Sequence, residues 1–177
     1  MPSHVSQKNE MNAKRIIVPI PTGAGLFLAH YSARGLTGLE FPSGKYLRRM
    51  VVAKSGSLPP PVCRWHRLAV LALRCALAGK VVVDLPPLDL SAGTLFQTRV
   101  WGALRNIPPG TTMTYAQIAA AVSKPKAVRA VGGACGANPI PILIPCHRVL
   151  RTNGQLGGFT AGLKWKRILL EREGVVI

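Results

Sequence analysis

The sequence predicts an α+β fold, in which a small N-terminal α/β domain with a short antiparallel sheet precedes a mainly helical, winged-helix-like C-terminal domain containing a helix-turn-helix. Three observations support this prediction. Short apolar runs separated by turns come first, a long segment of helical spacing follows, and closely spaced helix signals fill the second half. We expect the domains to span residues 1–92 and 93–177, with a loose polar tail at the N-terminus.

The first half of the chain provides the strands and the long helix. Apolar runs at Ile16–Ile20, Gly25–Tyr31 and Gly35–Phe41 are separated by turn-forming residues and predict an antiparallel sheet. Apolar residues then recur at helical spacing over Val62–Ala78. We expect one more strand at Val81–Val83, before a proline-containing linker.

The second half begins with a predicted helix over Thr94–Asn106, with one apolar face formed by Leu95, Phe96, Val100, Trp101 and Leu104. Thr114 can cap a short helix that runs to Val122, because Gln117 three residues later completes a capping box. After a tight turn, Pro125 suits the first turn of a helix that ends near residue 136. Helix, tight turn and helix together form a helix-turn-helix.

The second helix of this pair is unusually rich in small residues, namely Ala130, Gly132, Gly133, Ala134, Gly136 and Ala137. Each glycine weakens a helix by about 1 kcal/mol relative to alanine, so three of them need a reason. Two reasons stay open: close approach to another backbone, whether of protein or of DNA, or tight helix packing inside the protein. Arg129 is the long cationic side chain in this helix.

The chain is strongly basic, with 23 Lys and Arg against 6 Asp and Glu, a formal net charge of +17. No acidic residue lies between Asp89 and Glu171. Such a charge attracts polyanions, of which nucleic acid is the commonest, although a solvated basic surface is the alternative. The start of the chain lacks a secretory signal and no apolar run is long enough to span a bilayer, so we expect no membrane contact and a cytoplasmic protein, or a nuclear one in a eukaryote.

The cysteines do not suggest a metal site or a disulfide framework. The four cysteines contain no CxxC pair, and the four histidines do not cluster with them at zinc-ligand spacing. Cys63 and His66 are near neighbours, but two ligands do not make a site. We therefore expect no metal and no cofactor.

The sharpest chemical signal is Cys146 followed by His147, directly after the apolar run Ile140–Ile144 and Pro145. A cysteine acts as a nucleophile only as the thiolate, and a histidine held by a carboxylate can take its proton. Adjacent side chains on an extended strand point apart, which favours a turn or a bridging water. Glu171 and Glu173 are the nearby acids. The alternative is a buried, inert thiol.

This cysteine lies in a set of motifs that resembles the 6-O-alkylguanine-DNA alkyltransferases. PCHRV follows an Asn-Pro and an apolar run, and the chain also carries TYxxIA at 114–119, RAVG at 129–132 and LLxxEG at 169–174. The motifs occur in the family's order over residues 95–174, and the first half resembles the family's N-terminal α/β domain. The combination is highly specific.

The resemblance implies roles at the reacting centre. Cys146 would be the alkyl acceptor, His147 its base through a water, and Glu173 the group that orients His147. Tyr115 would bind the flipped guanine and crowd the adjoining phosphate. Asn138 would tie the helix-turn-helix to the active-site turn.

The resemblance also implies the DNA contacts. Arg129 would insert into the duplex, with the helix in the minor groove, where small residues allow close approach. The expected DNA-binding residues are Thr114, Tyr115, Arg129, Ala130, Gly133 and Ala134. The expected pocket residues are Cys135, Pro141, Val149, Phe159 and Thr160, with the main chain of Val149 and Thr160 holding the base.

The implied function is DNA repair: a single-turnover, suicidal transfer of a methyl or other alkyl group from 6-O-alkylguanine, and from 4-O-alkylthymine, in duplex DNA after nucleotide flipping. We expect a monomer, with cooperative assembly on DNA left open. The rivals are an alkyltransferase-like protein that binds damage without transfer, a helix-turn-helix regulator and a thiol hydrolase. Cys146 argues against the first, because such binders replace the cysteine.

The chain departs from its wider family at a few places. No cysteine precedes Cys63, so the N-terminal zinc site of some members is not expected, and the length leaves no room for an added metal-binding regulatory domain. Phe159 and Ala161 stand where tyrosine and glycine are common, which leaves the range of accepted alkyl groups open.

Overall fold

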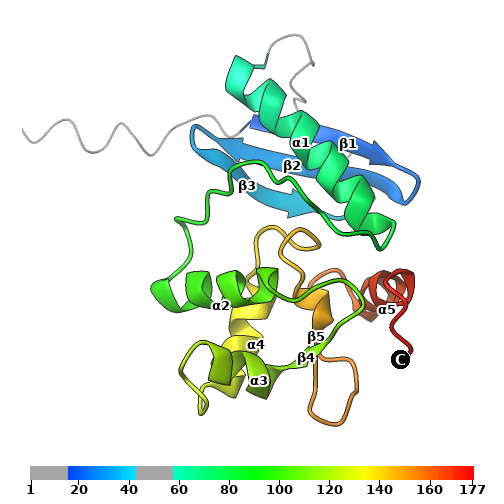
Figure 1. Cartoon of the computed structure of the whole chain (residues 1–177). Coiled ribbons are helices and arrows are strands. Elements are labelled where there is room, and N and C mark those ends of the chain that lie inside the picture. Colours follow the sequence, from blue (N-terminus) through cyan, green and yellow to red (C-terminus); the bar gives the residue numbers. More distant parts are fainter. Residues whose placement is uncertain (1–15, 43–57) are drawn as a thin grey trace, which may run out of the picture.

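A computed structural model describes residues 16–42 and 58–177 of the chain. The predicted loose N-terminal tail lies outside the described residues. Three strands form an antiparallel sheet in the order β1-β2-β3, and helix α1 lies across it, while helices α2 to α5 gather below the sheet in the view of Figure 1. This arrangement confirms the predicted fold class, whereas the domain boundary at residue 92 stays a prediction.

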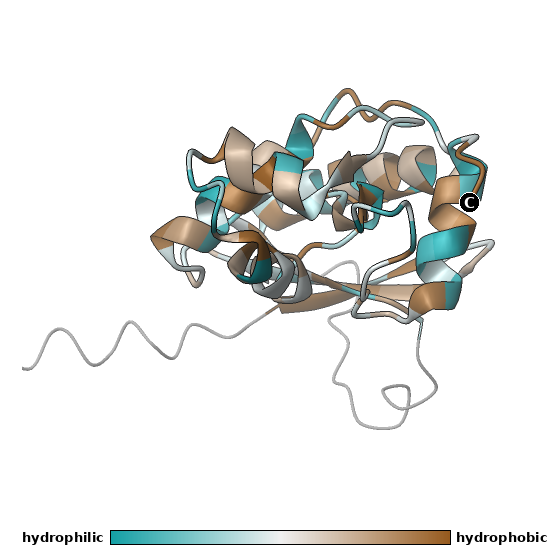
Figure 2. Cartoon of the chain, turned by 90° about the horizontal axis from the view of Figure 1, so that it is seen from below, coloured by the Kyte–Doolittle hydropathy of each residue, from teal (hydrophilic) through white to brown (hydrophobic). Residues whose placement is uncertain are grey.

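The sheet consists of β1 (Ile16–Thr22), β2 (Gly25–Ser32) and β3 (Gly35–Glu40), as the apolar runs predict. Helix α1 (Pro60–Leu77) starts with prolines in its first turn, where their missing N–H groups leave no helical hydrogen bond unmade. Its buried residues contact all three strands. Figure 2 shows the strands as mostly hydrophobic ribbon and the helices as a mixture of hydrophobic and hydrophilic turns.

The strand expected at Val81–Val83 is not formed. Val81 and Val83 are 67% and 87% exposed, so this valine run lies over the surface rather than in a sheet. The connector reaches the sheet later, where the N–H groups of Leu36 and Asp89 bond to the carbonyls of Pro87 and Leu36. Gly35 permits this approach, because a Cβ there would lie 2.2 Å from the Pro87 oxygen.

The second half contains α2 (Leu95–Arg105), the short strand β4 (Met113–Thr114), α3 (Tyr115–Ala121), α4 (Val128–Gly136) and α5 (Leu163–Arg172). Complete capping boxes, from Thr94 to Gln97 and from Thr114 to Gln117, start α2 and α3. Among the described residues, no helix is long and apolar enough to cross a membrane.

Two details of the expected helices are wrong. Helix α4 begins at Val128 rather than Pro125, because residues 124–127 form a turn closed by the Ala127 N–H on the Lys124 carbonyl. Leu95 is 70% exposed and does not share the buried face of α2, which Val100, Trp101 and Leu104 form. A position in the first turn of a helix can point away from the face that later turns bury.

A loop after α4 delivers the cysteine and histidine into a 3₁₀ helix, η3 (Cys146–Arg148), which leads into strand β5 (Val149–Leu150). Strand β5 pairs in parallel with β4, so the end of this turn lies beside the start of α3. Of the two arrangements that the sequence left open for Cys146 and His147, the structure shows the turn.

Candidate active site

Asn138 connects the end of α4 to the turn that carries the cysteine. Its Nδ2 donates hydrogen bonds to the Ile144 carbonyl at 2.7 Å and to Cys146 Sγ at 3.2 Å, and its Oδ1 accepts one from the Ile140 N–H at 3.1 Å. Asn138 and Cys146 are both buried. A buried amide bonded in this way holds the loop in one conformation and supplies a donor to the sulfur.

The environment of Cys146 works against spontaneous ionisation. Burial raises the pKa of its thiol, while the hydrogen bond from Asn138 and the nearby Lys166 cation favour the thiolate and lower the pKa in part. The thiol therefore needs a base to take its proton before it can act as a nucleophile.

His147, which directly follows Cys146, is the candidate for that base. Its Nε2 lies 2.9 Å from Glu173 Oε1, and both side chains are almost fully buried. Burial lowers the pKa of His147, which favours the neutral ring. Because the Nε2–H group donates its hydrogen bond to Glu173, Nδ1 is left as an acceptor, and among the described residues it has no hydrogen-bond partner. Glu171 is exposed, so the structure places Glu173 against the histidine.

Arg148 joins the hydrogen-bonded group of His147 and Glu173, although no role was predicted for it from the sequence. Its guanidinium donates to both Glu173 oxygens, at 2.9–3.2 Å, and Nη1 donates to the Ile107 carbonyl. Burial alone raises the pKa of Glu173, but the hydrogen bonds from His147 and Arg148 outweigh it and lower the pKa to about 2. Its place in the PCHR motif could have indicated this contact, since Arg148 directly follows the histidine that was expected to meet a carboxylate.

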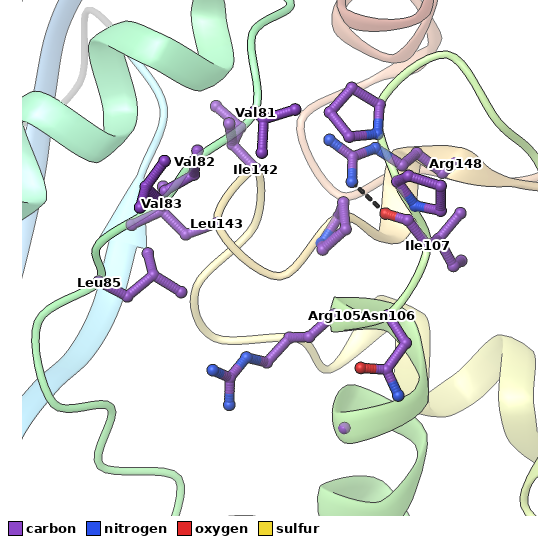
Figure 3. Close-up of a pocket in the computed structure, with 14 residues that line it drawn as sticks. Val81, Val82, Val83, Leu85, Arg105, Asn106, Ile107, Ile142, Leu143 and Arg148 are labelled. Atoms are coloured by element: carbon purple, nitrogen blue, oxygen red, sulfur yellow. Dashed lines mark hydrogen bonds between the residues drawn. The ribbon is translucent and has the colours of Figure 1, made fainter.

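Arg148 also forms part of the wall of a pocket of about 560 Å³, shown in Figure 3. The figure shows the valine connector on one side and Arg148 bonded to Ile107 on the other. None of the residues expected at the active site lines this pocket. It is therefore separate from the space in which the expected residues meet.

Several expected residues do meet at a second pocket, of about 490 Å³, beside α4. Tyr115, Arg129, Phe159 and Thr160 line it. Burial first, and then the nearby cysteines, raise the pKa of Tyr115 to about 12. Tyr115 thus lines the open pocket, lies near enough to Cys146 for the charge of a thiolate to raise its pKa, and keeps its proton at neutral pH.

Lys166 supports this region from inside the protein and was not anticipated. It is fully buried, and its Nζ donates to the Val149 carbonyl at 2.6 Å and to the Gly157 carbonyl at 3.4 Å. Burial lowers its pKa. The available signal was its spacing on α5, because Lys166 shares a helical face with the buried Leu169 and Leu170.

The expected DNA-binding residues divide between surface and core. Arg129, Ala130 and Gly133 are exposed on α4, while Thr114 and Tyr115 are half-buried at the start of α3. The expectation that the side chain of Ala134 contacts DNA is wrong. Ala134 is 2% exposed and its carbonyl accepts a hydrogen bond from Trp101 Nε1, so its side chain faces the core.

The three glycines of α4 do not serve close packing inside the protein. A Cβ added to Gly132, Gly133 or Gly136 would meet nothing within 4 Å among the described residues. Of the two reasons that the sequence left open for these glycines, internal packing is therefore unsupported. The glycines give α4 a slim outer face.

The remaining expected pocket residues, Cys135, Pro141 and Val149, are all buried. Cys135 does not line the pocket beside α4, and burial raises its thiol pKa to about 12. Val149 is also fully buried. Pro141 lines a neighbouring pocket of about 410 Å³, which also includes Thr160. Within residues 16–42 and 58–177, no group of three potential metal ligands comes together.

This fold and site define a class of proteins in which a helix-turn-helix adjoins a buried cysteine that is followed by a carboxylate-bound histidine. A family described as "6-O-methylguanine DNA methyltransferase, DNA binding domain" matches residues 95–175. The methylated-DNA–protein-cysteine methyltransferase of Haemophilus influenzae is 53% identical over 89% of this chain and 84% of its own length. The chain belongs to this family.

Other relatives and solved structures match this chain to different extents. The bifunctional transcriptional activator/DNA repair enzyme Ada of Escherichia coli is 56% identical over 87 residues, and the match covers 49% of this chain but only 24% of Ada. Among solved structures, Mycobacterium tuberculosis OGT in complex with DNA matches with a TM-score of 0.70 and 37% identity, covering 89% of this chain and 91% of that one. The 6-O-methylguanine-DNA methyltransferase of Pyrococcus kodakaraensis has a TM-score of 0.60 at 25% identity, covering 91% and 99%.

Proposed function

We propose that this protein repairs alkylated DNA by moving the alkyl group of 6-O-alkylguanine, or of 4-O-alkylthymine, onto Cys146. The observation that carries the proposal is the buried thiol bonded to Asn138 beside a neutral His147 backed by Glu173. Such a group generates a thiolate on demand, which is what an alkyl acceptor requires. The names of the relatives support the same reaction.

The reaction balances with the groups at the site. The Cys146 proton passes to Nδ1 of His147, through a bridging water, and the thiolate attacks the alkyl carbon in line. A sulfur–carbon bond forms while the carbon–oxygen bond breaks, its electron pair leaves with the guanine, and the guanine takes up one proton in place of the one that the thiol released. The Tyr115 hydroxyl, which stays protonated at neutral pH, donates a hydrogen bond to the purine as it leaves. The product is a thioether, so each molecule reacts once.

Duplex DNA is the proposed partner, bound through its minor groove by a monomer. The slim face of α4, the exposed Arg129 and the net charge of +17 support this geometry. The alkyl carbon is inaccessible inside a stacked duplex, so the nucleotide must flip into the pocket beside Tyr115. We further propose that the protein acts in the cytoplasm, or in the nucleus of a eukaryote.

An intact-mass measurement tests the proposal. Wild-type protein mixed with a duplex containing one 6-O-methylguanine should gain one methyl group per chain, and Cys146→Ala should gain none. Cys135→Ala is the matched control, because Cys135 is another buried thiol beside the same site, and it should still gain the methyl. Binding without any mass change would instead indicate the alkyltransferase-like alternative.

A further inference from the structure

The pocket beside α4 has a second cationic wall that the proposed function does not use. Arg151 lines this pocket together with Tyr115 and Arg129. Arg129 belongs to α4, whereas Arg151 directly follows β5. The two guanidinium groups therefore reach one pocket from different elements of the fold.

The backbone of Arg151 is held in place although its side chain is exposed. Its N–H donates to the Gln155 carbonyl at 2.9 Å, and its carbonyl accepts from the Gly154 N–H at 2.9 Å. Leu150 and Leu156 pair next to this turn. Arg151 thus lies at the base of a closed hairpin, whose backbone hydrogen bonds fix the position of its Cα atom on the pocket wall.

The charge of Arg151 has no acidic partner in the described part of the chain, where all four ion pairs involve other cations. Arg151 lines the pocket with Tyr115, and its charge lowers the pKa of that hydroxyl against the larger effect of burial. A free guanidinium offers a planar fork of donors that matches phosphate oxygens. An arginine without an acidic partner on the wall of this pocket therefore suits a phosphate group.

We propose that Arg151 is a positioning residue that binds a backbone phosphate next to the flipped nucleotide. The proposal rests on the proposed function, since a flipped nucleotide brings its flanking phosphates to the mouth of this pocket. Arg129 fills the gap that the flipped nucleotide leaves in the duplex. Arg151, which follows β5, binds the phosphate backbone beside the flipped nucleotide. Tyr115 lines the same pocket as the two cations.

The first test compares duplex and free-base substrates. Arg151→Ala should lower the rate of methyl transfer from a 6-O-methylguanine duplex about tenfold, the factor expected for one lost charge-assisted hydrogen bond. Transfer from free 6-O-benzylguanine, which has no phosphate, should change less than about twofold. Arg151→Lys should restore part of the duplex rate. Arg67→Ala, which removes an exposed arginine from α1, is the charge-matched control and should leave both rates near wild type.

The second test locates the phosphate. Neutral methylphosphonates replace, one at a time, the phosphates on either side of the lesion. One of them should slow the wild type and have no further effect in Arg151→Ala, because the contact is already missing. Additive losses at every position, or equal slowing of duplex and free base by Arg151→Ala, would overturn the inference. If the wild type transfers from neither substrate, the proposed function itself fails, and the two failures are thus distinguishable.

Discussion

Glu173 reaches back from the end of α5 and places its Oε1 2.9 Å from Nε2 of His147, across 26 positions of the chain. The contact fixes which ring nitrogen carries the proton, and it leaves Nδ1 as the basic atom. Arg148 keeps the same carboxylate ionised by donating to both of its oxygens. Glu173 can therefore orient the histidine without taking a proton from it.

The Glu173 contact predicts a pair of contrasting substitutions. Glu173→Gln should slow methyl transfer from duplex DNA by roughly 10²-fold, because a mispositioned general base forfeits most of its contribution. Glu171→Gln removes an equivalent but exposed carboxylate and should change the rate by less than about twofold. Single-turnover rates from quenched reactions provide the measurement. Similar rates for the two variants would show that the His147 contact has no role in transfer.

Stability should fall with acid, and Glu173 should account for part of the loss. Its folded-state pKa of about 2 lies below the unfolded value, so its contribution is complete above about pH 5 and disappears as the pH falls toward 2. Between pH 7 and pH 3, about 2 kcal/mol of the free energy of unfolding should be lost through this group. Buried His147 acts in the same direction below about pH 6.5, because its folded-state pKa is lowered.

Urea unfolding at both pH values measures this effect. Glu173→Gln should show a smaller drop between pH 7 and pH 3 than the wild type, and Glu171→Gln should show the full drop. An unchanged drop in Glu173→Gln would contradict the assignment.

Gly157 should be far less tolerant than its neighbour Gly158. A Cβ at Gly157 would lie 2.3 Å from the hydroxyl oxygen of Tyr115, whereas one at Gly158 would meet nothing within 4 Å among the described residues. Gly157→Ala should therefore displace Tyr115 and slow transfer by about tenfold, a modest share of what misplaced groups can cost. Gly158→Ala should react like the wild type. Equal rates for the two alanine variants would mean that the position of Tyr115 does not limit the reaction.

Lys166 should make the Cys146 thiol more acidic than burial alone allows. Lys166→Met removes the buried cation that lowers the pKa of Cys146, and it leaves the Val149 carbonyl without its donor. We expect a higher thiol pKa and transfer slowed by roughly tenfold, about the effect of losing one charged hydrogen bond. Lys164→Met, which removes an exposed lysine one position before Trp165 on α5, is the control.

The pH dependence of Cys146 alkylation by a small reagent reports the thiol pKa in both lysine variants. A thiol pKa that Lys166→Met leaves unchanged would contradict the electrostatic role.

Local signals predicted most of the elements. The capping box at Thr114 marked the start of α3, because a cap depends on residues only three positions apart. The strand expected at Val81–Val83 failed for the opposite reason. A β-branched run becomes a strand only where a sheet edge is available, and here the connector meets β3 later, at Leu88.

By itself, the sequence determined the family resemblance, the reactive cysteine and its adjacent histidine, since these depend on residue identity and order. Only the tertiary structure decided that Arg148 shares the Glu173 carboxylate with His147. It also decided that Ala134 faces the core and that Arg151 joins Arg129 at one pocket. Each of these depends on contacts between residues far apart in the chain. Packing of the whole fold, rather than local propensity, sets such contacts.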